Sequence, residues 1–111
     1  MNDSHKSPSE ILQGAYHALL RLGWTKGAYF EDKKCCLVGA LQLAAYGNRM
    51  GPADSDQELA KQWAYRYIED VIDPGPDGTD LEAWNDAPGR TIQELRHVLI
   101  TAYHLAKVKG Q

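Results

Sequence analysis

The chain has 111 residues, 43% of them hydrophobic and 24% charged, with a net charge of −3 and a pI near 5.7. This length supplies one hydrophobic core but not two. The acidic balance argues against nucleic acid as the main partner, because phosphate binding needs clustered Lys and Arg. No apolar run approaches the roughly 20 residues that span a bilayer, and no signal-peptide pattern opens the chain. We therefore expect a cytoplasmic protein without membrane contact: a flexible polar tail over residues 1–6, then a single helical domain over residues 7–111.

The first predicted helix has clear signals at both ends. Ser7 can cap it, Pro8 suits the first helical position, and Glu10 completes a capping box. Apolar residues then recur at helical spacing up to Gly23, which is the stop signal. The connection that follows, Trp24–Asp32, can hold a short extended piece, but no partner strand is evident.

The second predicted helix, Lys33–Tyr46, is hydrophobic nearly all round, since only Gln42 interrupts its apolar run from Cys35 onward. A helix of this kind belongs in the middle of a bundle. Its small residues Gly39 and Ala40 allow another segment to approach closely. Either the rest of the chain or a second copy can cover it, so a homo-oligomer is left open.

Two further helices and a short turn complete the prediction. The third helix spans Asp56–Ile72 and ends at the breaker run Asp73–Thr79, after which a capped helical turn covers Asp80–Trp84. The last helix, Thr91–Lys107, opens with a capping box that Glu94 completes. The third helix is expected to bury Ala60, Trp63, Ala64, Tyr67, Ile68 and Val71. The predicted fold class is all-α: a compact bundle of four main helices plus a short helical turn, with the second helix central.

Two short segments, Cys36–Leu41 and Trp84–Thr91, carry residues that a plain helical protein does not need. Cys36 lies at the start of the apolar helix, where the helix dipole and two preceding lysines can acidify its thiol. If Asn85 or Asp86 oriented a histidine beside it, Cys36 would be the nucleophile of a cysteine-dependent hydrolase.

The histidine that such a dyad needs is missing from the predicted core. His17 lies roughly opposite the apolar stripe of the first helix, and His97 and His104 point away from the stripe of the last one. The fourth, His5, is in the polar tail. We therefore assign no catalytic residue, favour a protein that is not an enzyme, and expect Cys36 to be a small buried hydrophobe.

Cys35 and Cys36 are the only cysteines, and they are adjacent. They cannot bridge distant segments, and they cannot easily fill two corners of a tetrahedral metal site. No Cys-x2-Cys or His-x3-His pair occurs in the chain. We expect free thiols, no metal and no cofactor, with Cys35 nearer the surface than Cys36.

The Trp84–Asp86 connection has three interpretations. In the first, Trp84 anchors the loop in the core while Asn85 and Asp86 act as turn residues that bond to nearby backbone. In the second, Asp86 reaches the amides at the start of the second helix, beside Cys36. In the third, the loop and those amides hold a small anionic or polar ligand. The candidate ligand or structural-lock residues are Cys36, Gly39, Trp84, Asn85, Asp86 and Arg90.

The pairing of Cys-Leu-x-Gly-Ala-Leu (Cys36–Leu41) with Trp-Asn-Asp-x-x-Gly-Arg-Thr (Trp84–Thr91) resembles a small family of uncharacterised proteins in actinobacteria and their phages. The matching segments cover the centre and the C-terminal third of the chain. The resemblance implies a shared small domain and a phage or prophage accessory protein that binds something in its host. It supplies no catalytic residues.

The leading functional hypothesis is a small module that binds and modulates a host protein, because no complete catalytic set and no nucleotide-binding loop is present. Aromatic residues are common at binding hot spots, and those available are Tyr29, Phe30, Tyr46, Tyr65 and Tyr103. The alternative is a small-ligand or nucleotide-binding protein that uses the region of Cys36 and Asp86. A cysteine-dependent hydrolase comes third. DNA binding comes last, because the third helix offers only Lys61 and Arg66 against the acidic residues Glu58, Glu69 and Asp70.

Overall fold

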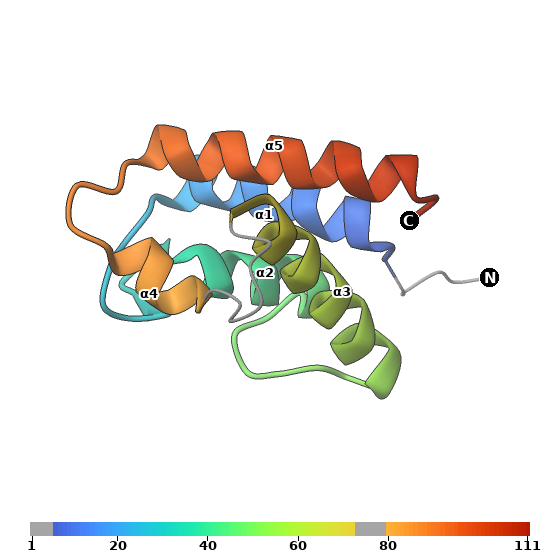
Figure 1. Cartoon of the computed structure of the whole chain (residues 1–111). Helices are drawn as coiled ribbons and strands as arrows, with labels where there is room; N and C mark the ends of the chain where they lie inside the picture. Colours follow the sequence, from blue (N-terminus) through green and yellow to red (C-terminus); the bar gives the residue numbers. More distant parts are fainter. Residues whose placement is uncertain (1–5, 73–79) are drawn as a thin grey trace.

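Helices account for most of the part of the chain that the structure describes (Figure 1). The computed structural model describes residues 6–72 and 80–111, so most of the expected tail and the breaker run Asp73–Thr79 lie outside the described residues. In chain order the elements are α1 (Pro8–Leu22), β1 (Phe30–Glu31), β2 (Lys34–Cys35), α2 (Leu37–Tyr46), α3 (Ser55–Ile72), α4 (Leu81–Asp86) and α5 (Ile92–Val108). The all-α expectation is therefore correct in outline, with a small two-stranded sheet added. None of the described helices is long and apolar enough to cross a membrane.

Helices α1 and α5 lie side by side and antiparallel (Figure 1). Both predicted capping boxes are present, Ser7 with Glu10 and Thr91 with Glu94. Where α1 begins and α5 ends, the backbone N–H and the hydroxyl of Ser9 both donate to the carbonyl of Gln111, at 3.2 and 3.0 Å. The start of α1 is thereby tied to the end of α5.

The second helix, α2, starts at Leu37 rather than at Lys33 as the sequence predicts. Lys34 and Cys35 form β2, which pairs antiparallel with β1 in the register Phe30 opposite Cys35. The extended piece expected after Trp24 therefore does have a partner. Cys35 also bonds to the segment after α1, since its N–H donates to the carbonyl of Gly23 at 3.0 Å. These backbone bonds hold Cys35 in an extended conformation, and α2 begins only at Leu37.

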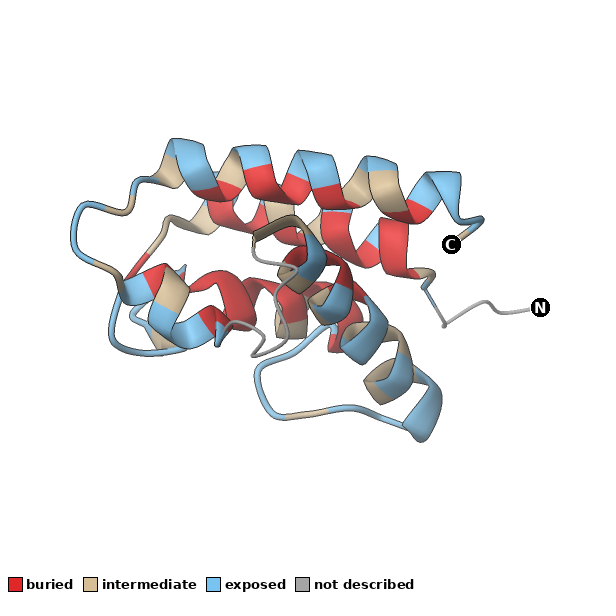
Figure 2. Cartoon of the chain, in the orientation of Figure 1, coloured by how far each residue is buried: buried red, intermediate tan, exposed pale blue. Residues whose placement is uncertain are grey.

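Helix α2 is the most completely buried of the described helices (Figure 2). This helix contacts α1, α3 and α4, and eight residues of its ten-residue span are buried. Only part of α3 contributes to the core: Ala64, Tyr67 and Ile68 are buried as expected, whereas Ala60 and Val71 are half-buried. Trp63 was expected to be buried, but 39% of it is exposed. The N-terminal half of α3 projects past the other helices (Figure 1), and the ring contacts of Trp63 are with Tyr67 and Arg66 of its own helix.

The predicted turn before the last helix is a full short helix. Asp80 caps α4 by accepting from the N–H of Glu82, as expected, but the helix continues through Asp86 rather than ending at Trp84. Asn85 and Asp86 are frequent turn formers because their side chains compete for nearby backbone groups. Here both side chains bond mainly to groups far along the chain, and the local backbone is left free to stay helical.

Candidate functional site

The side chain of Asn85 joins three segments of the chain, and we name these bonds the Asn85 hub. Its Oδ1 accepts from the indole Nε1 of Trp24 at 2.7 Å and from the N–H of Leu37 at 3.0 Å. Its Nδ2 donates to the carbonyl of Thr25 at 3.1 Å and to Oδ1 of Asp86 at 2.9 Å. Asn85 is fully buried, and these four bonds use its donors and acceptor completely.

The contact that the sequence predicts between Asp86 and the start of α2 is made by Asn85 instead. Asn85, and not Asp86, accepts an orphan amide at the start of α2. The buried position faces two donors and one carbonyl acceptor, which an amide can satisfy and an ionised carboxylate cannot. Asp86 lies outside at the surface, where its carboxylate accepts from the N–H of Gly27 at 2.9 Å. The hydrogen bonds from Asn85 and Gly27 lower the pKa of Asp86.

Cys36 caps α2 with its sulfur, which accepts from the N–H of Gly39 at 3.3 Å. Burial raises the pKa of the Cys36 thiol and outweighs the lowering effect of the helix amides. Cys35 was expected nearer the surface but is fully buried, and burial raises its pKa to about 11. The described histidines are all exposed on α1 and α5, so no Cys–His dyad forms among the described residues. Slow alkylation of both thiols at neutral pH is the expected behaviour.

Gly39 is needed because a backbone segment passes directly over it. A Cβ atom at this position would lie 2.4 Å from the carbonyl oxygen of Tyr29. That oxygen is held in place because it accepts from the N–H of Cys36 at 3.0 Å. The loop after α1 can therefore close onto α2 only where there is no side chain.

Trp84 and Arg90 form a second contact, next to the hub. Trp84 is half-buried, and the Arg90 guanidinium lies 3.8 Å from the centre of its ring. Arg90 also donates from Nε to the carbonyl of Trp84 at 2.8 Å and pairs with Glu94 at 3.1 Å. These contacts fix the turn between α4 and α5. The tryptophan whose indole bonds to the hub is Trp24, which the sequence did not single out; a lone indole in a polar connection is the signal that it needs an acceptor.

A small hollow of about 190 Å³ remains beside the hub. Its walls include Tyr29, Cys36 and the carboxylates of Glu82 and Asp86. A hydrogen bond to Glu82, together with partial burial, raises the pKa of Tyr29 to about 12. The amides of Leu37 and Gly39 already have acceptors, so the hollow presents negative charge and no free helix amide at those two positions. Within the described ranges no group of three His, Cys, Asp or Glu side chains is placed to hold a metal ion.

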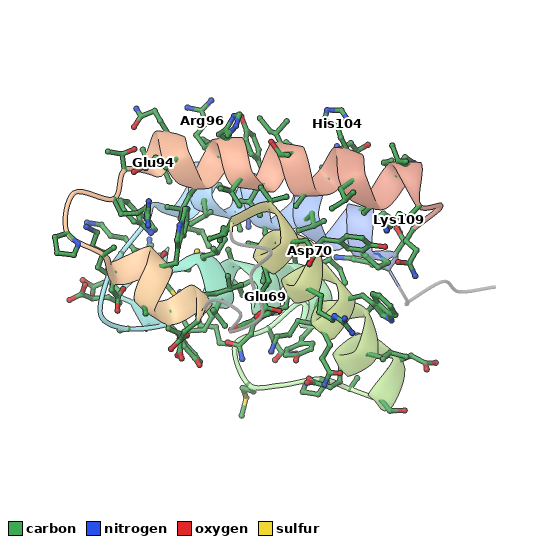
Figure 3. The ribbon with its side chains drawn as sticks, viewed as in Figure 1. Glu69, Asp70, Glu94, Arg96, His104 and Lys109 are labelled. Carbon is green, nitrogen blue, oxygen red and sulfur yellow. The ribbon has the colours of Figure 1, made fainter. Side chains whose placement is uncertain are left out.

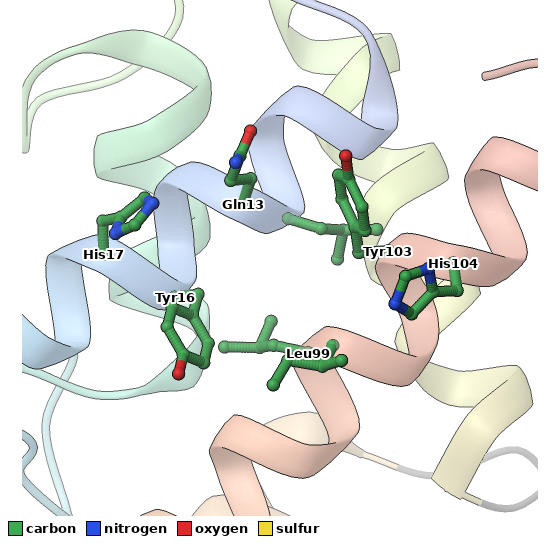
Figure 4. A pocket seen from close by; sticks show the side chains of 8 residues that line it. Gln13, Tyr16, His17, Leu99, Tyr103 and His104 are labelled. Carbon is green, nitrogen blue, oxygen red and sulfur yellow. The ribbon is translucent and has the colours of Figure 1, made fainter.

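A larger hollow of about 330 Å³ lies between α1 and α5, and we name it the α1/α5 groove (Figure 4). Leu12 and Leu99 are buried at its base. Side chains from both helices form its walls (Figure 4): Gln13, Tyr16, His17, Ile100, Tyr103 and His104. The sequence assigned the two histidines to a solvated face, and the paired Tyr-His steps on both helices are the signal that was missed. Of the five aromatics proposed for an interface, Tyr103 lines this groove, whereas Tyr46 is buried and bonds to Glu58.

Comparison with known proteins identifies a family for the chain. The sequence model of a family of unknown function, DUF6197, matches residues 3–105, which include the hub and nearly all of α5. No curated protein and no solved structure shows a significant match to the chain. The chain therefore belongs to the DUF6197 family, a family of unknown function.

Proposed function

We propose that this chain is a small, non-catalytic accessory protein of the phage or prophage type, which binds and modulates a host protein in the cytoplasm. The observation that carries the proposal is the α1/α5 groove, an open and mainly apolar hollow between two helices. The phage-type origin rests on the resemblance of Cys36–Leu41 and Trp84–Thr91 to actinobacterial and phage proteins.

Exposed apolar side chains support this use of the groove. Ile100 in its wall is 44% exposed, and Leu20, one turn beyond His17 on α1, is 48% exposed. Contiguous apolar surface rimmed by polar groups is typical of protein–protein contact sites, and tyrosines often supply the binding energy there. The groove is built on two packed antiparallel helices, α1 and α5, which Ser9 and Gln111 tie together at one end, so its shape is held in advance of binding.

Position-specific crosslinking tests the proposal. A photoreactive phenylalanine analogue replaces Ile100 in the groove, and a matched variant carries it at Asp70, an exposed residue of α3. In actinobacterial cells we expect one host protein to crosslink from position 100 and not from position 70. The purified partner should then bind the unmodified chain and lose at least about tenfold in affinity to Ile100→Asp. Equal crosslinking from both positions, or an unchanged affinity, would contradict the proposal.

A small-ligand protein is the second candidate, and the hollow beside Cys36 is the observation that favours it. Because Glu82 and Asp86 face this hollow, its charge suits a small cation rather than a nucleotide. The measurement is a thermal shift with an aliphatic diamine and with a nucleotide as probes. Stabilisation by the diamine alone, lost in Glu82→Gln, supports this candidate, and no shift with either probe rejects it.

A further inference from the structure

Charge is distributed unevenly along α1 and α5. Each helix contains a single carboxylate, Glu10 or Glu94, and each carboxylate is used in the capping box of its own first turn. Because the helices are antiparallel, these two acids lie at opposite ends of the pair. Between them every ionisable side chain apart from the tyrosines is histidine or a cation: His17, Arg21, Arg96, His97, His104 and Lys107.

The acidic residues that make the whole chain negative lie elsewhere. Glu69 and Asp70 belong to α3, whereas Arg96 and His104 point outward from α5 on another side of the molecule (Figure 3). Helices α3 and α4 together carry six acidic residues, Asp56, Glu58, Glu69, Asp70, Glu82 and Asp86, against Lys61 and Arg66. With the histidines neutral, α1 and α5 carry three cations against the two capping carboxylates, so they form a mildly basic face on a chain whose net charge is −3.

We propose that the α1/α5 groove binds an acidic amphipathic helix of the partner protein, an inference that rests on the proposed function and names its ligand. The apolar anchors of that helix enter the hollow over Leu12 and Leu99. Its Asp and Glu side chains face Arg96, beside Tyr16 of the groove wall, and the wall histidines His17 and His104. Arg96 is already positioned for this role, since its guanidinium is held at Tyr16 by hydrogen bonds of 3.1 and 3.3 Å to the phenolic oxygen.

The shape of the site favours a helix over other ligands. A groove between two packed helices accepts the side-chain ridge of a third helix, with anchors spaced by three or four residues. In the described part of the chain, β1 and β2 are each only two residues long, and neither lines the groove. Binding by strand addition is therefore not favoured there. A symmetric contact between two copies would bring two basic faces together, which costs binding energy. The apolar base distinguishes the groove from a phosphate-binding surface, which would rest on Lys and Arg alone.

Two synthetic peptides and one oligonucleotide test the inference on the full chain. Both peptides are amphipathic helices with the same leucine anchors; one carries Glu at its flanking positions and the other carries Lys. The third probe is a single-stranded DNA of equal negative charge. We expect the Glu peptide to bind at least about tenfold more tightly than the Lys peptide at low salt, and more weakly as salt rises. Amide NMR shifts should map to the groove residues. In the Arg96→Glu/Lys107→Glu variant, the preference between the peptides should reverse, and circular dichroism checks that the variant is folded.

Each other outcome overturns the inference. These outcomes are equal affinity for the two peptides, no binding of the Glu peptide up to millimolar concentration, shifts that map to α3, or tighter binding of the DNA. Light scattering that shows a dimer broken by Ile100→Asp would make a second copy the occupant instead. The wider proposal is judged separately: if the crosslinker at position 100 traps a host protein through a segment that is not an acidic helix, the binding function stands and only this ligand assignment fails.

Discussion

The Asn85 hub and the α1/α5 groove use their polar and aromatic groups in opposite ways. In the hub, Asn85 is fully buried and bonds to groups on the α1–β1 connection, α2 and α4. In the groove, the wall residues His17, Ile100 and His104 are exposed on the outer sides of α1 and α5. The unusual residues that attract notice in the sequence therefore bond within the fold, while ordinary residues of two amphipathic helices form the open groove that we propose as a binding surface.

Removing the hub side chain should have the largest effect on stability. Asn85→Ala leaves the indole of Trp24, the N–H of Leu37 and the carbonyl of Thr25 without their partner. Because buried groups lose their bonds without gaining water, we expect a loss of about 4 kcal/mol in the free energy of unfolding. Urea denaturation measures it. Trp24→Phe is the matched control, since it removes one of these bonds and should cost about 1 kcal/mol. A loss below about 1 kcal/mol in Asn85→Ala would mean that the hub is not a lock.

The close approach of the loop to α2 predicts the next largest effect. In Gly39→Ala the new methyl carbon would lie 2.4 Å from the carbonyl oxygen of Tyr29, which is a collision. We expect a net loss of about 2 kcal/mol in the free energy of unfolding after the gain in helix propensity. The same change at Gly14 of α1 is the control, because there the methyl group lies 3.0 Å from the Cβ and 3.7 Å from the Cα of Ala44, and it meets no carbonyl oxygen. Its stability should stay within about 0.5 kcal/mol of the unmodified chain, as propensity offsets the tight contact. Equal losses in both variants would show that helix crowding in general, rather than this loop, limits the site.

Asp86 predicts a smaller effect that depends on pH. Its hydrogen bonds from Asn85 and Gly27 lower its pKa in the folded chain, so its contribution is present above the pKa of the unfolded chain and disappears as pH falls through the folded value. Since Asp86 is exposed, Asp86→Ala should cost no more than about 1 kcal/mol at pH 7, and the difference from the unmodified chain should shrink below about pH 4. Asp86→Asn keeps the acceptor for Gly27 and should lose only the acid-dependent part. A difference that persists unchanged at pH 3 would assign the effect to packing.

How far the sequence could predict the molecule differs between these two regions. Capping boxes and helical spacing are local, and they located α1 and α5 closely. The sequence also identified Asn85 and Asp86, but it could not assign their partners, because Trp24 and Leu37 approach Asn85 only once the fold has formed. The strand at Cys35 was missed for the same reason: its pairing with Phe30 overrides a run that is locally helical. The groove was missed because a histidine on a polar helix face looks the same whether it faces water or a hollow between two helices.

The smallest expected effect on stability comes from the groove itself. Ile100 is 44% exposed, so Ile100→Ala should change the free energy of unfolding by no more than about 0.5 kcal/mol. Its neighbour Leu99 is almost fully buried, and Leu99→Ala should cost about 3 kcal/mol through the cavity that it leaves. Two adjacent positions on α5 thus separate surface from core in one denaturation experiment. If Ile100→Ala lost as much as Leu99→Ala, the groove would be part of the core and the contrast with the hub would fail. If it keeps its stability but loses the partner that the crosslinker traps, binding and folding depend on different faces of the same helix.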